Sequence, residues 1–305
     1  MLITYVSVCH QQTGTPNKAR QLFGTSSSIS LPATFFNTIM KFSKHIFEFE
    51  DLSWFPDTIR LSMTDYLRYV LTILNFYQPI TPLLIEGLHQ TSSTQIIDLC
   101  SGGGGAIEQI KNNVEQQSRS KIKITLTDKY PNKSAFEFLA AKTKGSISYS
   151  DISVDAADVP ADLKGFRTIF SGFHHFSNSS AASVIKNAVD AKSGIGIFDG
   201  GDKNIFVILG ISLLHPVAFF LLTPFFKPFR YSRIFFTYLI PIIPLCTIWD
   251  GMISITRLYK PTELLKIARQ VDNENYVWKA GKVKNKLRMN VAYLIGYPLQ
   301  KKEVN

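Results

Sequence analysis

Residues whose side chains can do chemistry stand near the ends of short apolar runs in this sequence. The run Gln95–Leu99 is followed by a glycine-rich stretch, CSGGGG, at positions 100–105. Asp128 ends a second run, Asp155 lies shortly after a third, and the pair His174–His175 follows a fourth. Carboxylates and glycine-rich turns in such places hold polar or anionic ligands, and a histidine beside a substrate can act as a base. The sequence therefore indicates a ligand site assembled from the ends of several strands.

The glycine-rich stretch predicts how the first part of this site is built. Residues 96–99 are mostly apolar and β-branched, which is typical of a buried strand, and residues 106–117 have helical composition. Glycines between the two allow positive φ angles and the close approach of a ligand. The first turn of the helix offers free N–H groups. This is the arrangement of a nucleotide-type loop at the first crossover of a doubly wound sheet.

Two common nucleotide loops fit the stretch poorly. The dinucleotide fingerprint needs a third small residue, and the best alignment, Gly102-x-Gly104-x-x-Ile107, lacks it. A Walker loop ends in Gly-Lys-Ser/Thr, and this stretch does not. The glycines alone leave the cofactor open, so its identity depends on the later strands.

The later sequence supplies the other elements of such a sheet. Residues 121–128 alternate between polar and apolar, which is typical of a strand, and Pro131 stands early in a predicted helix over residues 131–143. Further strands are predicted at 146–149, 166–171, 194–200, 275–279 and 291–296, with helices at 179–191 and from Pro261. The pattern favours an α/β, doubly wound fold.

Taken together, these features resemble the class I S-adenosylmethionine (SAM)-dependent methyltransferases. The resemblance lies in Asp98 before the glycines, Asp128 at the end of the next strand, and the segment that begins Asp155–Ala156. It implies SAM as cofactor, with Asp128 accepting the ribose hydroxyls and Asp155 facing the adenine amino group. Asp151 is an alternative to Asp155, and Asp128 as an ordinary turn residue is an alternative to its ribose role. The cofactor-binding residues implied are Asp98, Leu99, Cys100, Ser101, Gly102, Gly104, Asp128, Lys129, Asp155, Ala156 and Ser171.

The resemblance also implies the complete architecture. We expect a doubly wound, seven-stranded, mostly parallel sheet with helices on both faces, an antiparallel last strand, an N-terminal helical cap and a hydrophobic helical insert after strand 5. The expected divisions are a poorly ordered extension at 1–39, the cap at 40–94, the SAM-binding core at 95–202, the insert at 203–249, the closing helix and strands at 250–298, and a tail at 299–305.

Three residues are candidates for catalysis: His174, His175 and Asp250. Either histidine could be a base near the substrate, or could instead cap a helix or pack. Asp250 could accept a proton or have only a loop role. A metal site is not expected, because adjacent histidines point apart on an extended chain and no further ligand cluster is visible.

The N-terminal part carries two weaker expectations. Its first ten residues, MLITYVSVCH, lack the basic region and the apolar length of a signal peptide. A start at Met40 would look more natural. In the expected cap, a helix is predicted to begin at Thr64 or Asp65. Tyr66 and Arg68 on it are either cofactor contacts or ordinary packing and surface residues.

The insert is the main clue to the substrate. Ile205–Leu222 has 18 residues without charge, and a second uncharged run covers 15 residues, 234–248, with Lys227, Arg230 and Arg233 between them. About 20 residues are needed to span a bilayer. A hairpin that dips into one leaflet, a spanning pair, and a buried lid or dimer interface all remain open. Each of these arrangements places an apolar environment near the carboxyl end of the fifth strand, where substrate is expected to bind.

Composition and charge complete the expectations. The formal net charge is +10, and the three cysteines form neither a metal spacing nor a disulfide framework, which fits a reducing compartment. We expect a methyltransferase for a small lipophilic acceptor, membrane-associated with its catalytic core in the cytoplasm. Nucleic acid is not an expected partner, because residues 171–174 (SGFH) replace the Pro-Pro-Tyr-type motif of base amino-methyltransferases. Alternatives are an RNA or protein methyltransferase that uses the basic C-terminal face, a non-catalytic SAM-fold membrane protein, and an NAD-type oxidoreductase. The oligomeric state is open.

Overall fold

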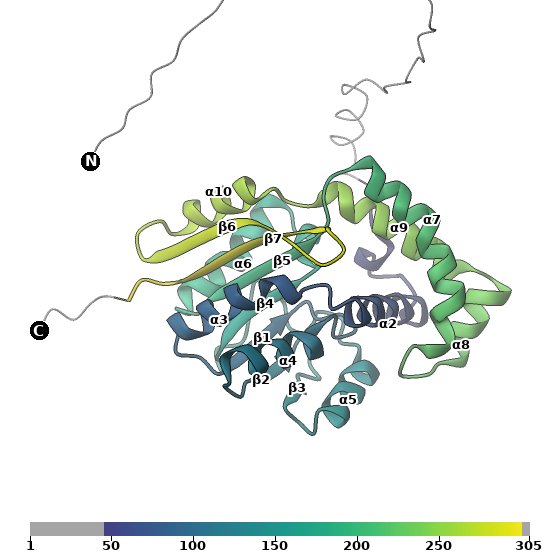
Figure 1. Cartoon of the computed structure of the whole chain (residues 1–305), viewed down its shortest axis with the longest axis horizontal. Coiled ribbons are helices and arrows are strands. Elements are labelled where there is room, and N and C mark those ends of the chain that lie inside the picture. Colours follow the sequence, from purple (N-terminus) through teal and green to yellow (C-terminus); the bar gives the residue numbers. More distant parts are fainter. Residues whose placement is uncertain (1–45, 301–305) are drawn as a thin grey trace, which may run out of the picture. The chain divides into compact units, whose positions relative to one another are not determined.

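A seven-stranded sheet organises the part of the chain that the computed structural model describes, residues 46–300 (Figure 1). The strand order is β3-β2-β1-β4-β5-β7-β6. Neighbours among the first five strands run parallel, and β7 is antiparallel to both β5 and β6. The predicted fold class is therefore confirmed. The expected extension at 1–39 lies outside the described residues.

The strands have the predicted places but not always the predicted lengths. They are β1 (Gln95–Leu99), β2 (Lys123–Leu126), β3 (Ile147–Tyr149), β4 (Phe166–Phe170), β5 (Ile195–Gly200), β6 (Tyr276–Lys284) and β7 (Asn290–Pro298). The last two are longer than expected, because they pair with each other in register along their whole length. Strand β6 lies at the edge of the sheet and contains Lys279, Lys282 and Lys284.

Helices connect and cover the strands (Figure 1). The longer ones are α2 (Asp57–Ile73), α3 (Thr81–Gln90), α4 (Ile107–Ser118), α5 (Lys133–Lys142), α6 (Asn178–Asp190), α7 (Ile205–Leu222), α9 (Ile242–Arg257) and α10 (Pro261–Val271). Short turns of helix are η2 (Phe49–Asp51), η3 (Gln78–Ile80), η4 (Phe173–His175), η5 (Thr223–Phe225), α8 (Tyr231–Ile234) and η6 (Phe235–Leu239).

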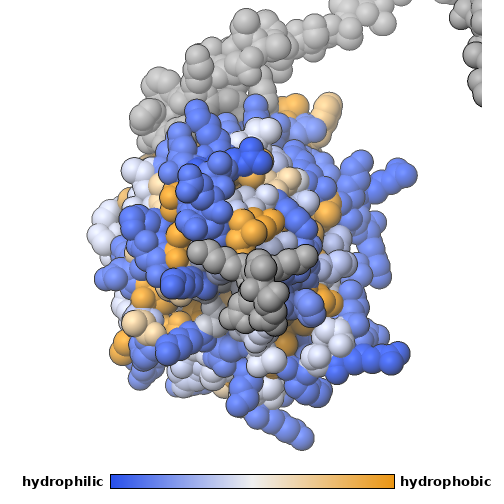
Figure 2. Space-filling model, turned by 90° about the vertical axis from the view of Figure 1, so that its left-hand side faces the viewer, coloured by the Kyte–Doolittle hydropathy of each residue, from blue (hydrophilic) through white to orange (hydrophobic). Residues whose placement is uncertain are grey.

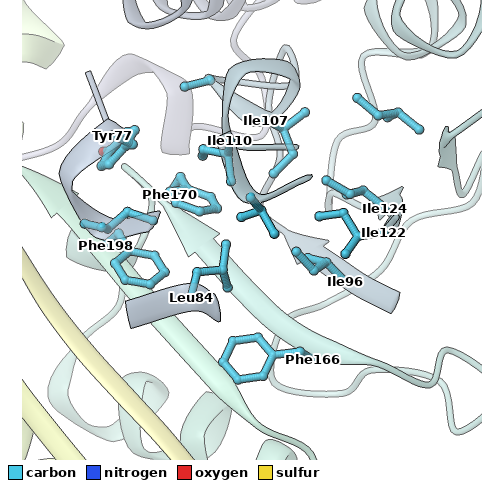
Figure 3. Packing of buried hydrophobic residues seen from close by; sticks show 14 of the residues in the cluster. Tyr77, Leu84, Ile96, Ile107, Ile110, Ile122, Ile124, Phe166, Phe170 and Phe198 are labelled. Atoms are coloured by element: carbon cyan, nitrogen blue, oxygen red, sulfur yellow. The ribbon is translucent and has the colours of Figure 1, made fainter. Parts of the chain in front are cut away.

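Alternate strand residues face two separate cores, as the period of a strand requires. Ile96, Ile124 and Phe166 pack with residues of α3, α4 and α5 on one face (Figure 3). Ile97 and Ile169 pack with residues of α6 and α10 on the other. The helices on both faces leave the carboxyl ends of the parallel strands free to form a site.

A third apolar cluster joins α2 to the insert. Met63 and Tyr66 of α2 pack against Phe219 of α7, Phe226, and Ile243 of α9. Helix α2 begins at Asp57, so the predicted start at Thr64 or Asp65 is wrong. Thr64 and Asp65 lie inside the helix, and Asp65 is fully buried against the insert instead of capping an end.

The insert is a helical hairpin whose tip is fixed to the rest of the protein. The carboxylate of Asp65 is contacted by the guanidinium groups of Arg230, at 3.3 Å, and of buried Arg233. Arg230 also reaches Asn132. Helix α9 runs without a break to Arg257, through the position 249/250 at which the insert was expected to end.

Candidate active site

A cavity of about 330 Å³ lies at the carboxyl ends of β1, β2 and β4. Its size is ordinary for a small-molecule site. Helix α2 closes one side of it with Leu61, Thr64, Leu67 and Leu71. The predicted residues that line the cavity are Cys100, Ser101, Gly102, Asp128, Lys129, Asp155, Ala156, Ser171 and His175.

The glycine loop is pressed against α2. A Cβ atom on Gly103 would lie 2.6 Å from the carbonyl oxygen of Thr64, so only glycine fits there. Gly102 has φ of 56°, and Cys100 and Ser171 also adopt positive φ although they are not glycines. Backbone strain of this kind gathers at binding loops. These two strained turns follow β1 and β4 and face the same cavity.

Asp98 holds the loop from behind. Its carboxylate accepts hydrogen bonds from Ser101 and Thr168, each at 2.7 Å, and its backbone carbonyl accepts from Thr127. It is buried, and burial raises its pKa to about 7. Asp98, Leu99 and Gly104 do not line the cavity, so the structure places these three predicted residues one layer behind the wall.

Asp128 and Asp155 stand at adjacent strand ends. The Asp128 carboxylate accepts the N–H groups of Gly102 and Tyr130, each at 2.7 Å, which fixes its orientation toward the cavity. Burial raises its pKa. Asp155 lies 3.2 Å from Lys129, and Asp151 is not part of the wall. Each carboxylate oxygen accepts more than one hydrogen bond, so both side chains can still bind the hydroxyl or amino groups of a nucleoside.

The opposite wall is acidic and contains His175. The imidazole Nδ1 atom lies 2.8 Å from Asp51, and 3.6 Å from Glu48 behind the wall. Burial alone would lower the pKa of His175, but Glu48 and Asp51 raise it to about 10. The two carboxylates therefore stabilise positive charge at this imidazole, whether it is a proton or another cation, which disfavours a free base there. Burial, reinforced by Asp250, raises the pKa of Glu50 to about 8.

His174 and Asp250 lie behind this wall. Asp250 accepts the backbone N–H groups of Phe49, at 2.8 Å, and Glu50, at 3.1 Å, so it shapes the wall instead of facing the cavity. The two histidine rings lie 4.4 Å apart between centroids. The assumption that they point apart is wrong, because residues 173–175 form a tight helical turn instead of an extended chain.

Some of the site was missed in the sequence. Glu50 and Asp51 come from the acid-rich run FEFED at positions 47–51, which was a visible signal. Arg60 lines the cavity, and its guanidinium lies 4.9 Å from the ring centroid of Tyr130. Tyr66 and Arg68, the two candidate contacts on α2, do not line the cavity.

No protein-family model and no curated protein matches the sequence. Among solved structures, the chain is similar to the plantazolicin methyltransferase BpumL in complex with SAH, with 11% identity, a TM-score of 0.46, and coverage of 86% of this chain and 98% of that one. It is also similar to an O-methyltransferase family protein from Burkholderia thailandensis, with 14% identity, a TM-score of 0.40, and coverage of 74% and 57%. A third is the pyocyanin biosynthetic protein PhzM, with 9% identity, a TM-score of 0.42, and coverage of 72% of this chain and 54% of that one.

The chain spans little more than half the length of the last two structures. At these identities and TM-scores the similarities carry no argument about activity, which depends on the geometry above. The seven-stranded, mostly parallel sheet, the antiparallel β7 and the loops after β1 and β2 are those that the resemblance implied. The fold is therefore the α/β architecture that the resemblance to class I SAM-dependent methyltransferases implied.

Proposed function

We propose that the protein is a SAM-dependent methyltransferase that acts on a small lipophilic acceptor at a membrane surface. One observation carries the cofactor assignment. The glycine loop after β1, Asp128 after β2 and Asp155 beyond β3 line one cavity in this fold. Bound SAM supplies an electrophilic methyl group. Asp128 and Asp155 would bind its nucleoside, and the cavity walls would orient the methyl donor toward the acceptor.

The membrane part of the proposal is supported by the surface of α7. This helix carries no charge, and Phe206, Leu213 and Leu214 are 76%, 69% and 68% exposed. Of its residues, only Phe219 is buried. Ile205–Phe225 is long and apolar enough to cross a membrane by length and composition. A contiguous apolar surface of this kind marks a site of membrane or protein contact.

The anchored tip favours a hairpin that lies in one leaflet over a spanning pair. A spanning hairpin would carry its tip across about 30 Å of hydrocarbon, away from the core. The tip instead carries Arg230 and Arg233, which bind Asp65 of α2. Those basic residues hold the hairpin against the protein. The exposure of α7 also weighs against a buried lid.

The apolar surface contrasts with another face. Figure 2 shows the side that lies at the left in Figure 1, where hydrophilic residues cover most of the visible surface and apolar ones are scattered. In the basic strand β6, Lys279 pairs with Glu86, and Lys282 lies 2.5 Å from Asp202. This pairing weakens the alternative of an RNA methyltransferase that uses the basic C-terminal face.

A transfer assay tests the function. The full chain is incubated with methyl-labelled SAM and, separately, with a lipid extract, total RNA and a protein fraction. We expect label in the organic phase of the lipid reaction and much less label with Asp128→Ala at a SAM concentration that does not saturate the variant. Label that enters RNA or protein instead would overturn the acceptor class. An absence of transfer to any fraction, with SAM binding intact, would favour the non-catalytic alternative.

A further inference from the structure

A group of metal-ligand side chains lies beside the cavity. One ligand atom each from Glu48, His174 and His175 lies within 4.8 Å of the other two. Glu48 precedes η2, whereas both histidines belong to the turn after β4, so the fold brings together residues more than 120 positions apart. Two imidazoles and a carboxylate are a ligand set used by zinc and by other divalent transition metals.

His174 is the observation that points to a ligand. It is 7% exposed, and neither of its ring nitrogens has a hydrogen-bond partner. Its Nδ1 atom lies 3.5 Å from Asp199, whose Oδ1 atom is buried and also lacks a hydrogen bond. Buried polar atoms are almost always hydrogen-bonded, so a buried imidazole that makes no hydrogen bond marks a place where a partner belongs.

The surrounding groups match the outer shell of a metal site. His175 contacts Asp51 at 2.8 Å, and His174 faces Asp199, so each imidazole has its own carboxylate. Metal-binding histidines usually have such a partner, which orients the ring. Glu48 is oriented from the other side by Arg257, at 3.0 Å from Oε1. Arg257 also contacts Asp51.

Charge balance agrees with this geometry. Two of the carboxylates here, Glu48 and Asp199, are buried, and Arg257 contacts the first of them. Buried carboxylates are costly unless a cation is close. A metal ion would supply that charge at the point where the two histidines meet.

We propose that Glu48, His174 and His175 bind a divalent transition-metal cation. Ligand atoms around tetrahedral zinc lie about 3.4 Å apart, so the side chains close in slightly when the ion binds. Because His175 and Asp51 also line the cavity, the ion lies at its wall. The site is independent of SAM, and its failure would leave the proposed function untouched.

Zinc binding to the metal-stripped full chain, without SAM, is the test. Isothermal titration with Zn²⁺ is expected to give one tight site in the wild type. We expect at least a 100-fold loss of affinity in His174→Gln. The control is His89→Gln, which removes an exposed histidine at the end of α3 and is expected to bind like the wild type.

A second measurement guards against a variant that misfolds. Zn²⁺ is expected to raise the melting temperature of the wild type and of His89→Gln, and to leave that of His174→Gln unchanged, because a ligand stabilises only a fold that binds it. Co²⁺ is expected to show ligand-field absorption with the wild type and not with His174→Gln. Equal zinc affinity in wild type and His174→Gln, or no binding by the wild type, would overturn the proposal.

Discussion

At the scale of single residues, acids that face the cavity differ in role from an acid that stabilises the loop behind it. Asp128 and Asp155 face it, whereas Asp98 holds the loop through Ser101 and Thr168. The sequence could predict that all three acids stand near strand ends. It could not separate their roles, because that depends on which side of a turn each carboxylate takes.

Asp128→Ala is expected to weaken SAM binding by about 10- to 100-fold. A hydrogen bond to a charged group contributes about 1.5–3 kcal/mol, and this carboxylate would accept from the ribose. Asp151→Ala, the matched control outside the wall, is expected to change the affinity by less than about 2-fold. Isothermal titration measures both. Comparable losses would contradict the assignment.

Asp98→Asn is expected to change how stability depends on pH. Burial raises the pKa of Asp98 from 3.8 to about 7, so between these values the folded state keeps a proton that the unfolded state releases. The wild type therefore loses stability as pH rises through this window, by up to about 4 kcal/mol.

The variant lacks this loss. Its free energy of unfolding relative to wild type is expected to increase from pH 4 to pH 7 and then level off, in urea titrations without cofactor. A difference in the free energy of unfolding that is already present at pH 4 comes from the altered hydrogen bonds to Ser101 and Thr168. Parallel pH curves for the two proteins would refute the buried-charge account.

At the scale of elements, the hairpin α7–α9 is the distinctive part of the molecule. Its apolar helices were predictable from two uncharged runs. Its attachment was not, because the pairing of Arg233 with Asp65 joins residues 168 positions apart. The same limit applies to the acidic wall, where Asp51 and His175 are separated by 124 positions.

Asp65→Ala is expected to destabilise the protein by about 3–5 kcal/mol. It leaves Arg233 buried without its counter-charge, and a broken buried pair costs about this much. Asp57→Ala on the same helix is the control, since that side chain is 80% exposed and its ion pair with Arg60 contributes about 1 kcal/mol or less. Urea unfolding monitored by circular dichroism measures both. Equal losses would show that the anchor does not hold the hairpin.

A double substitution, Leu213→Glu with Leu214→Glu, is expected to reduce liposome binding at least about 100-fold. Both side chains are exposed on α7, so folding is unaffected while burial of two leucines in lipid is lost. Leu287→Glu, 52% exposed in the β6–β7 turn, is expected to bind like the wild type. Flotation with vesicles of neutral and anionic lipid measures the partition. A wild-type protein that stays at the bottom of the gradient would contradict the proposed membrane association.

At the scale of the whole molecule, the sheet was the most predictable feature. Short β-branched runs, glycine turns and strand-end acids are local signals, and they lie in the order that the doubly wound topology requires. The meeting of His174, His175 and Glu48 was not predictable, because it depends on a tight turn after β4 and on how the segment before α2 folds back over it.

SAM binding by the full chain tests the central claim most directly. Isothermal titration with SAM, and with NAD in parallel, is expected to give one saturable site for SAM and none for NAD. The SAM signal is expected to fall in Asp128→Ala and to persist in Asp151→Ala. Binding of NAD in place of SAM, or no heat from SAM up to about 1 mM, the upper end of ordinary substrate affinities, would contradict the account.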